Sequence, residues 1–230
     1  MFKELLSVFR SSDPLRAMEK NFSEMLIIGY QMVMSAGEMF FTGSATAEER
    51  TELYRRDVRV NKLQRHIRKQ VVAHLSVPGN RPDVPYSLLL VSLVKDVERI
   101  GDYAKNLAEL GDIRSGALVE DEFTLELQQI RREAEASFKE LSVVLGSSDR
   151  EWAVELIRQG RDAAHRCDAL IARIASSDHD ARTATTLVLG TRYYKRIGGH
   201  VLNVLSSIVM PIHKIDYYDE DEMPGAADEG

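Results

Sequence analysis

The sequence predicts an all-α protein built from six long helices. Apolar residues recur at spacings of three and four residues through most of the chain, which is the periodicity of one helix face. No stretch alternates apolar and polar residues with the period of two that is typical of a strand. Only 6 prolines and 14 glycines occur in 230 residues, and several of them separate the periodic segments. Long helices with short connections favour an antiparallel bundle.

The first three helices are expected at residues 14–41, 47–75 and 86–111. Asp13 suits an N-cap and Pro14 suits the first helical position. A segment rich in proline and glycine, residues 76–85, is predicted to be the loop between the second and third helices.

The other three helices are expected at residues 120–145, 150–175 and 180–210, where Pro211 ends the last one. Residues 1–13 are predicted to form a short amphipathic N-terminal helix. Residues 216–230 contain seven acidic side chains and are predicted to be a disordered acidic tail.

An internal repeat divides the chain into two halves. The tripeptide Arg-Ile-Gly at 99–101 recurs at 196–198, and Asn106 recurs as Asn203, in both cases 97 positions later. A weaker match relates residues 61–63 to 168–170. Because the matching helices come in the same order, we predict two copies of a three-helix unit, at residues 14–112 and 119–213.

Composition excludes several classes of protein. The net charge of −6 lies largely in the tail, so the body has no basic field for nucleic acid. A single cysteine, Cys167, excludes an internal disulfide and fits a reducing compartment. No segment approaches the ~18 uninterrupted apolar residues that a membrane-spanning helix needs. Phosphate-cradling Gly-Lys-Ser/Thr loops, His-Glu-x-x-His and Cys-x-x-Cys motifs are also missing from the sequence.

Two pairs of oxygen-bearing side chains are candidates for metal binding: Asp57 with Asn61, and Glu98 with Asp102. A spacing of four residues places each pair on one helix face. Both pairs fall on shoulders of their helices, between the apolar stripe and the solvent face. If the two helices are neighbours, three carboxylates and one amide converge in a shared groove. The alternative is that these acids form ordinary ion pairs, with Lys95, Arg99 and Lys105 as partners.

Residues 97–104, Val-Glu-Arg-Ile-Gly-Asp-Tyr-Ala, followed by Asn106, Leu107 and Ala108, resemble the signature of the PhoU family. The Asp57–Asn61 motif is similar to that family's other acidic motif, and the resemblance covers residues 14–213. It implies a tandem pair of three-helix bundles and iron or zinc at the acidic motifs. It also implies a cytoplasmic homodimer that regulates phosphate import, docking to a phosphate transporter, a sensor histidine kinase or both. Membrane association would then be peripheral, through the transporter.

The chain departs from that pattern in ways that limit the metal prediction. Asn61 replaces the usual acid, and in the second half Lys195 stands where Glu98 stands. Gly199 stands opposite Asp102 and Ala164 opposite Asp57, so only Asp168, opposite Asn61, keeps an acid. We therefore expect at most one site, formed by Asp57, Asn61, Glu98 and Asp102. His165 and His200 lie near the degenerate site and are alternative ligands.

Three functions compete at this point. The first is a regulator of phosphate transport and signalling, and the second is an accessory subunit of a sodium–phosphate or other anion or metal transporter. The third, a di-metal enzyme, requires Glu-x-x-His pairs that point into a bundle core. The sequence contains no such pair, so we expect no enzyme. Cations in the second helix, between Arg55 and Lys69, either form a solvated face or dock an acidic partner or anionic lipid.

Overall fold

A computed structural model describes residues 13–113 and 116–215 of the chain. Within these residues the fold is all-α and contains no strand. The long helices are α2 (Asp13–Thr42), α3 (Ala47–Leu75), α4 (Val84–Ile113), α5 (Glu122–Ser147), α6 (Arg150–Ala175) and α7 (Ala181–Val209). Two short 3₁₀ turns, η1 (Arg81–Asp83) and η2 (Ile212–Lys214), complete the described chain. All six predicted helices are confirmed, with bounds within two residues of those expected.

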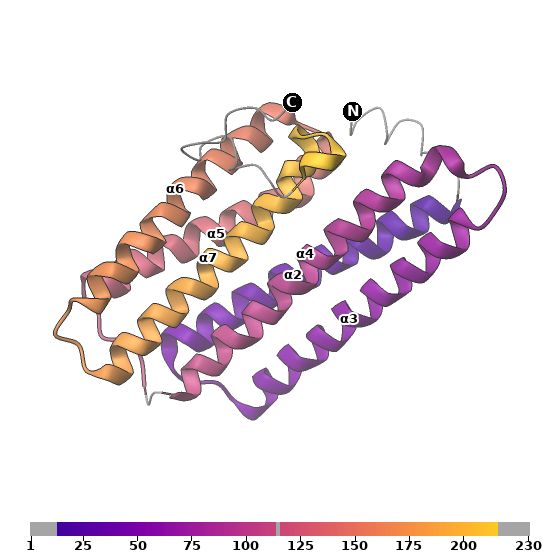
Figure 1. Ribbon diagram of the computed structural model, residues 1–230. Helices are drawn as coiled ribbons and strands as arrows, with labels where there is room; N and C mark the ends of the chain where they lie inside the picture. Colours follow the sequence, from indigo (N-terminus) through magenta and orange to yellow (C-terminus); the bar gives the residue numbers. More distant parts are fainter. Residues whose placement is uncertain (1–12, 114–115, 216–230) are drawn as a thin grey trace.

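The helices form two three-helix bundles that lie side by side (Figure 1). Helices α2, α3 and α4 make the first bundle, and α5, α6 and α7 make the second. Helix α4 packs against α7 and α2 packs against α5, so these two contacts join the bundles. The tandem arrangement is therefore as predicted. The predicted N-terminal helix before residue 13 and the acidic tail at 216–230 lie outside the described residues.

Side-chain caps explain where several helices begin. Thr46 and Glu49 form a reciprocal capping box at the start of α3. Aspartates cap all three helices of the second bundle: Asp121, Asp149 and Asp180 each accept a hydrogen bond from a first-turn backbone N–H. The loop expected at 76–85 is shorter than predicted. Helix α4 begins at Val84, because proline at position 85 is tolerated in a first turn, where its missing N–H leaves no helical bond unmade.

A close contact between α2 and α7 depends on a glycine. Gly190 is buried, and a Cβ placed on it would lie only 2.4 Å from Cζ of the fully buried Phe40. Gly199, further along α7, has the opposite environment, since a Cβ placed on it would meet no described atom within 4 Å apart from its chain neighbours and the nearby backbone of its own helix. Alanine substitutions at these two glycines of α7 therefore distinguish the effect of packing on stability from the effect of helix propensity.

We predict that Gly190→Ala lowers the free energy of unfolding by about 1–2 kcal/mol, because displacement of the Phe40 ring outweighs the gain in helix propensity. The matched control Gly199→Ala should raise it by about 0.5–1 kcal/mol, since only propensity changes. Urea denaturation followed by circular dichroism measures both. Equal effects of the two substitutions would contradict the described α2–α7 contact.

Candidate functional site

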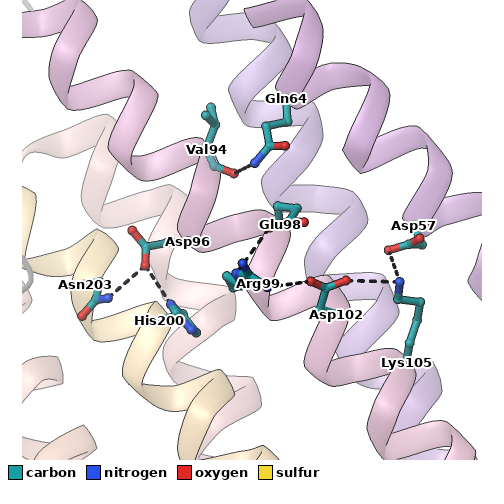
Figure 2. Close-up of polar contacts among 10 residues, drawn as sticks. All are labelled: Asp57, Gln64, Val94, Asp96, Glu98, Arg99, Asp102, Lys105, His200 and Asn203. Carbon is teal, nitrogen blue, oxygen red and sulfur yellow. Dashed lines mark hydrogen bonds and ion pairs between the residues drawn. The ribbon is translucent and has the colours of Figure 1, made fainter. Parts of the chain in front are cut away.

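The four residues predicted as metal ligands come together where α3 faces α4. Helix α3 supplies Asp57 and Asn61, and α4 supplies Glu98 and Asp102. Buried Gln64 ties the two helices beside this cluster, because its Nε2 donates to the Val94 carbonyl at 3.5 Å (Figure 2). Asp57 and Asp102 thus approach each other across the contact between α3 and α4, and metal binding by the four residues stays a prediction. We call Asp57, Asn61, Glu98 and Asp102 the acidic cluster.

Lys105 of α4 lies between two carboxylates of the acidic cluster (Figure 2). Its Nζ is 2.9 Å from Oδ1 of Asp57 and 3.2 Å from Oδ1 of Asp102, so the ammonium bridges α3 and α4. Asp57 is only 8% exposed, more deeply buried than the helix wheel predicted, because it lies on the buried face of α3 and Lys105 contacts it from α4. Burial lowers the pKa of Lys105, but the hydrogen bonds to Asp57 and Asp102, together with their negative charges, outweigh it and raise the pKa of the ammonium.

Three further oxygens of the cluster also face partners within the chain. Arg99 Nη1 lies 3.3 Å from Oδ2 of Asp102, and its Nε lies 3.8 Å from Oε2 of Glu98. Asn61 donates its amide Nδ2 to Oδ2 of Asp57 at 3.3 Å. Burial raises the pKa of Glu98, and the nearby charges of Asp102 and Asp57 raise it further, against the opposing effect of Arg99 and Lys105.

This arrangement does not present a ready metal site. Across residues 13–113 and 116–215, no group of three or more His, Cys, Asp or Glu side chains is placed to hold a metal ion. Asp57 and Asp102 direct oxygens at the Lys105 ammonium, and Asn61 turns its amide nitrogen toward Asp57. Iron or zinc at the acidic cluster requires displacement of Lys105 and stays a prediction. The ion pairs expected from the alternative interpretation are formed by Arg99 and Lys105.

The corresponding place in the second bundle contains another lysine–aspartate pair. Lys195 of α7 lies 2.5 Å from Asp168 of α6, between Nζ and Oδ2. His200 does not join this pair, since its Nδ1 lies 2.8 Å from Oδ1 of Asp96 on α4. His165 is exposed on α6. A lysine ammonium thus pairs with an acid at equivalent helix contacts in both bundles.

Sequence analysis missed a buried polar network that joins the bundles. Asp96 of α4 is 5% exposed, and its Oδ1 also accepts a hydrogen bond from Nδ2 of Asn203 on α7 at 2.9 Å (Figure 2). The ring of Tyr103 stacks on His200, with centroids 5.8 Å apart. The available signal was an acid placed between Val94 and Val97 in an apolar stretch. Because a buried carboxylate needs partners, this acid pointed to a contact with another helix.

We predict that Asp96→Ala lowers the free energy of unfolding by about 1–3 kcal/mol, because His200 and Asn203 lose their common buried acceptor. The double variant Asp96→Ala/His200→Ala should lose less than the sum of the two single losses, since one interaction is counted in both. Chemical denaturation of the four proteins gives the coupling energy. Strict additivity would show that the two side chains do not interact.

Cys167 is a buried structural thiol. It is 1% exposed, and burial raises its pKa to about 12, although Lys195 and Arg166 act in the opposite direction. The structure therefore favours the neutral thiol, which is neither a good nucleophile nor a metal ligand.

We predict that native protein reacts with iodoacetamide at pH 8 on the order of a thousandfold more slowly than an exposed cysteine, because little thiolate is present. Protein unfolded in urea should label fully at this one residue. Mass spectrometry of timed samples measures both rates. Rapid labelling of the native chain would contradict the buried environment of the thiol.

The outer side of α3 carries an uninterrupted set of positive charges. From Val58 to Leu75 this helix contains no aspartate or glutamate. Arg56 turns inward, where its Nη1 donates to Ser35 Oγ at 3.1 Å, and exposed Arg59 pairs with Glu24 of α2. Exposed Arg55 lies 3.7 Å from Glu52, between Nη1 and Oε2. Within residues 13–113 and 116–215, the exposed cations from Lys62 to Lys69 form no ion pair. We define the basic face of α3 by its exposed cations, which are Arg55, Arg59, Lys62, Arg65, Arg68 and Lys69.

Three comparisons place this architecture among known proteins. Residues 22–111, which include the acidic cluster, match the family model of the PhoU domain. The phosphate transport system regulatory protein PhoU from Streptococcus pneumoniae has a similar structure, with a TM-score of 0.69 and 16% identity over 86% of this chain and 95% of that one. PhoU from Pseudomonas aeruginosa gives a TM-score of 0.75 and 16% identity over 87% and 97%.

At this identity the structural likeness shows a shared fold. No curated protein matches the sequence. In the described part of the chain, no helix combines the length and the apolar character that crossing a bilayer requires.

Proposed function

We propose that this chain, whose residues 22–111 carry a PhoU domain, regulates inorganic phosphate transport and phosphate-responsive signalling. The observation that carries the proposal is the match across the whole of α3, most of α2 and nearly all of α4, the segment that contains the acidic cluster. The tandem bundles of two solved PhoU proteins support it through the shared fold. Such a function needs surfaces that recognise other proteins. We therefore look for these surfaces on the exposed faces of the helices.

The basic face of α3 is the surface we propose for docking. Helix α3 lies at the outer edge of the first bundle and packs mainly on α2 and α4 (Figure 1). Its exposed cations are accompanied by the exposed side chains of Tyr54 and Val58. Positive charges gathered on one face attract an acidic protein surface and repel a basic one. They therefore raise the association rate with the correct partner and disfavour wrong partners. The partner is then a phosphate transporter, a sensor histidine kinase or both, with a complementary acidic patch.

A second candidate is an accessory subunit of a sodium–phosphate or other anion or metal transporter, without a role in signalling. It is favoured by one observation: the match to the domain model is confined to the first bundle, and the second has lost most of its acidic motif. The two functions differ in whether a phosphate-starvation promoter responds to the protein. A homodimer in solution stays a prediction of the resemblance.

We predict that deletion of the gene in its own host raises phosphate uptake and phosphate-starvation reporter expression in phosphate-rich medium, and that the wild-type gene restores both. Lys62→Glu/Arg65→Glu/Lys69→Glu should fail to restore them, because reversing three charges of the basic face weakens docking roughly 10- to 100-fold. Uptake of labelled phosphate and the reporter signal are the measurements.

The matched control reverses three exposed cations elsewhere, Lys139→Glu/Arg192→Glu/Arg196→Glu, and should restore regulation like wild type. An effect of deletion on uptake alone would favour the accessory subunit. No effect of deletion on either readout would contradict both functions. Equal failure of the two triple variants would contradict the assignment of docking to α3.

A further inference from the structure

We propose that Lys105 is the resident cation of the acidic cluster, so that a divalent metal ion binds there only when the charge of this lysine is removed. The proposal concerns the purified chain and does not depend on the proposed function. The sequence predicted iron or zinc at this cluster. In the proposal, the ammonium group of Lys105 occupies the place of the metal ion.

The first argument is geometric. The Lys105 ammonium lies within 3.2 Å of one oxygen from α3 and one from α4, which is where an ion shared by the two helices would lie. It reaches this place because Lys105 and Asp102 are three residues apart on α4, while Asp57 faces them from α3. An ammonium and a hard metal ion use the same carboxylate oxygens. They therefore exclude each other from this place.

The second argument is the local balance of charge. The cluster contains three carboxylates, those of Asp57, Glu98 and Asp102. They make two contacts with Lys105 and two with Arg99. Asn61 is uncharged, whereas the similar motif of the PhoU family has an acidic residue at this position. With both cations in place the cluster has a net charge of about −1, too little to favour a divalent ion over water. Removal of the lysine charge alone brings it to about −2.

The third argument comes from the second bundle. There Lys195 of α7 reaches Asp168 of α6, as Lys105 of α4 reaches Asp57 of α3. The two lysines stand at different positions of the repeated unit, since Lys195 occupies the place of Glu98. Two lysines placed differently in sequence thus reach the same kind of helix contact. In both bundles, a lysine of the chain itself thus neutralises a carboxylate on the neighbouring helix.

An ordinary structural ion pair is the competing explanation of Lys105. It predicts that loss of the lysine only lowers stability and leaves metal binding unchanged. The proposal predicts that loss of the lysine creates metal affinity. The two explanations therefore differ in a single measurable quantity, the affinity of the chain for a divalent ion with and without the charge at residue 105.

The test uses the full chain as wild type, Lys105→Met and the charge-retaining control Lys105→Arg. Inductively coupled plasma mass spectrometry measures the metal carried through purification, and isothermal titration with Mn²⁺ and with Zn²⁺ measures affinity. We expect no stoichiometric metal in wild type or Lys105→Arg. Lys105→Met should bind about one ion per chain, at least tenfold more tightly than wild type.

Adding Glu98→Ala/Asp102→Ala to Lys105→Met should abolish the gained affinity, which places the ion at the acidic cluster and not at an incidental surface site. If Lys105→Met does not fold, as judged by circular dichroism, Lys105→Gln takes its place. Stoichiometric iron, zinc or manganese in wild type would overturn the proposal, and so would a folded Lys105→Met or Lys105→Gln variant with unchanged affinity. Neither result bears on phosphate regulation in cells.

Discussion

The position of α4 between α3 and α7 is the constraint on which the rest of the structure depends. One side of α4 faces α7, where the Asp96 carboxylate holds two side chains across the junction of the bundles. The other side faces α3 and carries the acidic cluster and Lys105. A helix that is packed on both sides cannot rotate to improve one contact without losing the other. The register of α4 therefore fixes the geometry of the cluster and of the bundle junction together.

This constraint explains the Glu-Arg-Ile-Gly-Asp sequence of α4 residue by residue. Ile100 is fully buried in the core. Gly101 faces α2, where a Cβ would lie 3.4 Å from Cε of Met32, which is an ordinary van der Waals contact. Glu98, Arg99 and Asp102 face the groove beside α3 and pair with one another. Three of the five positions are thus electrostatic and two serve packing.

Much of the fold follows from the sequence because long helices repeat their periodicity many times. The predicted bounds agree with the structure at each α-helix, and caps such as Asp149 lie where the connections were expected. The site was harder to predict. A helix wheel places Glu98 and Asp102 on a shoulder, but it does not describe how far a lysine side chain reaches. Lys105 was therefore only one of three candidate partners, and its position between two helices was not predicted.

Contacts between the bundles could not be predicted from the sequence, for a different reason. Asp96 and His200 are 104 positions apart, and periodicity within one helix says nothing about which distant helix it meets. Burial of Asp57 was likewise underestimated, because this residue lies on the buried face of α3 in line with Leu53 and Val60, and the helix wheel placed it on a shoulder. Ion pairs between helices therefore supply information that hydrophobic periodicity lacks. At the acidic cluster they change the expected cation from a metal ion to the ammonium of Lys105.

The measurement that tests this account most directly is a high-resolution crystal structure of the wild-type chain grown in millimolar Mn²⁺, with anomalous diffraction data. The account predicts that the Lys105 Nζ lies within hydrogen-bond distance of Asp57 and Asp102 and that no anomalous peak appears at the acidic cluster. An anomalous peak bound by Asp57, Glu98 or Asp102, with the Lys105 side chain turned to solvent, would contradict it.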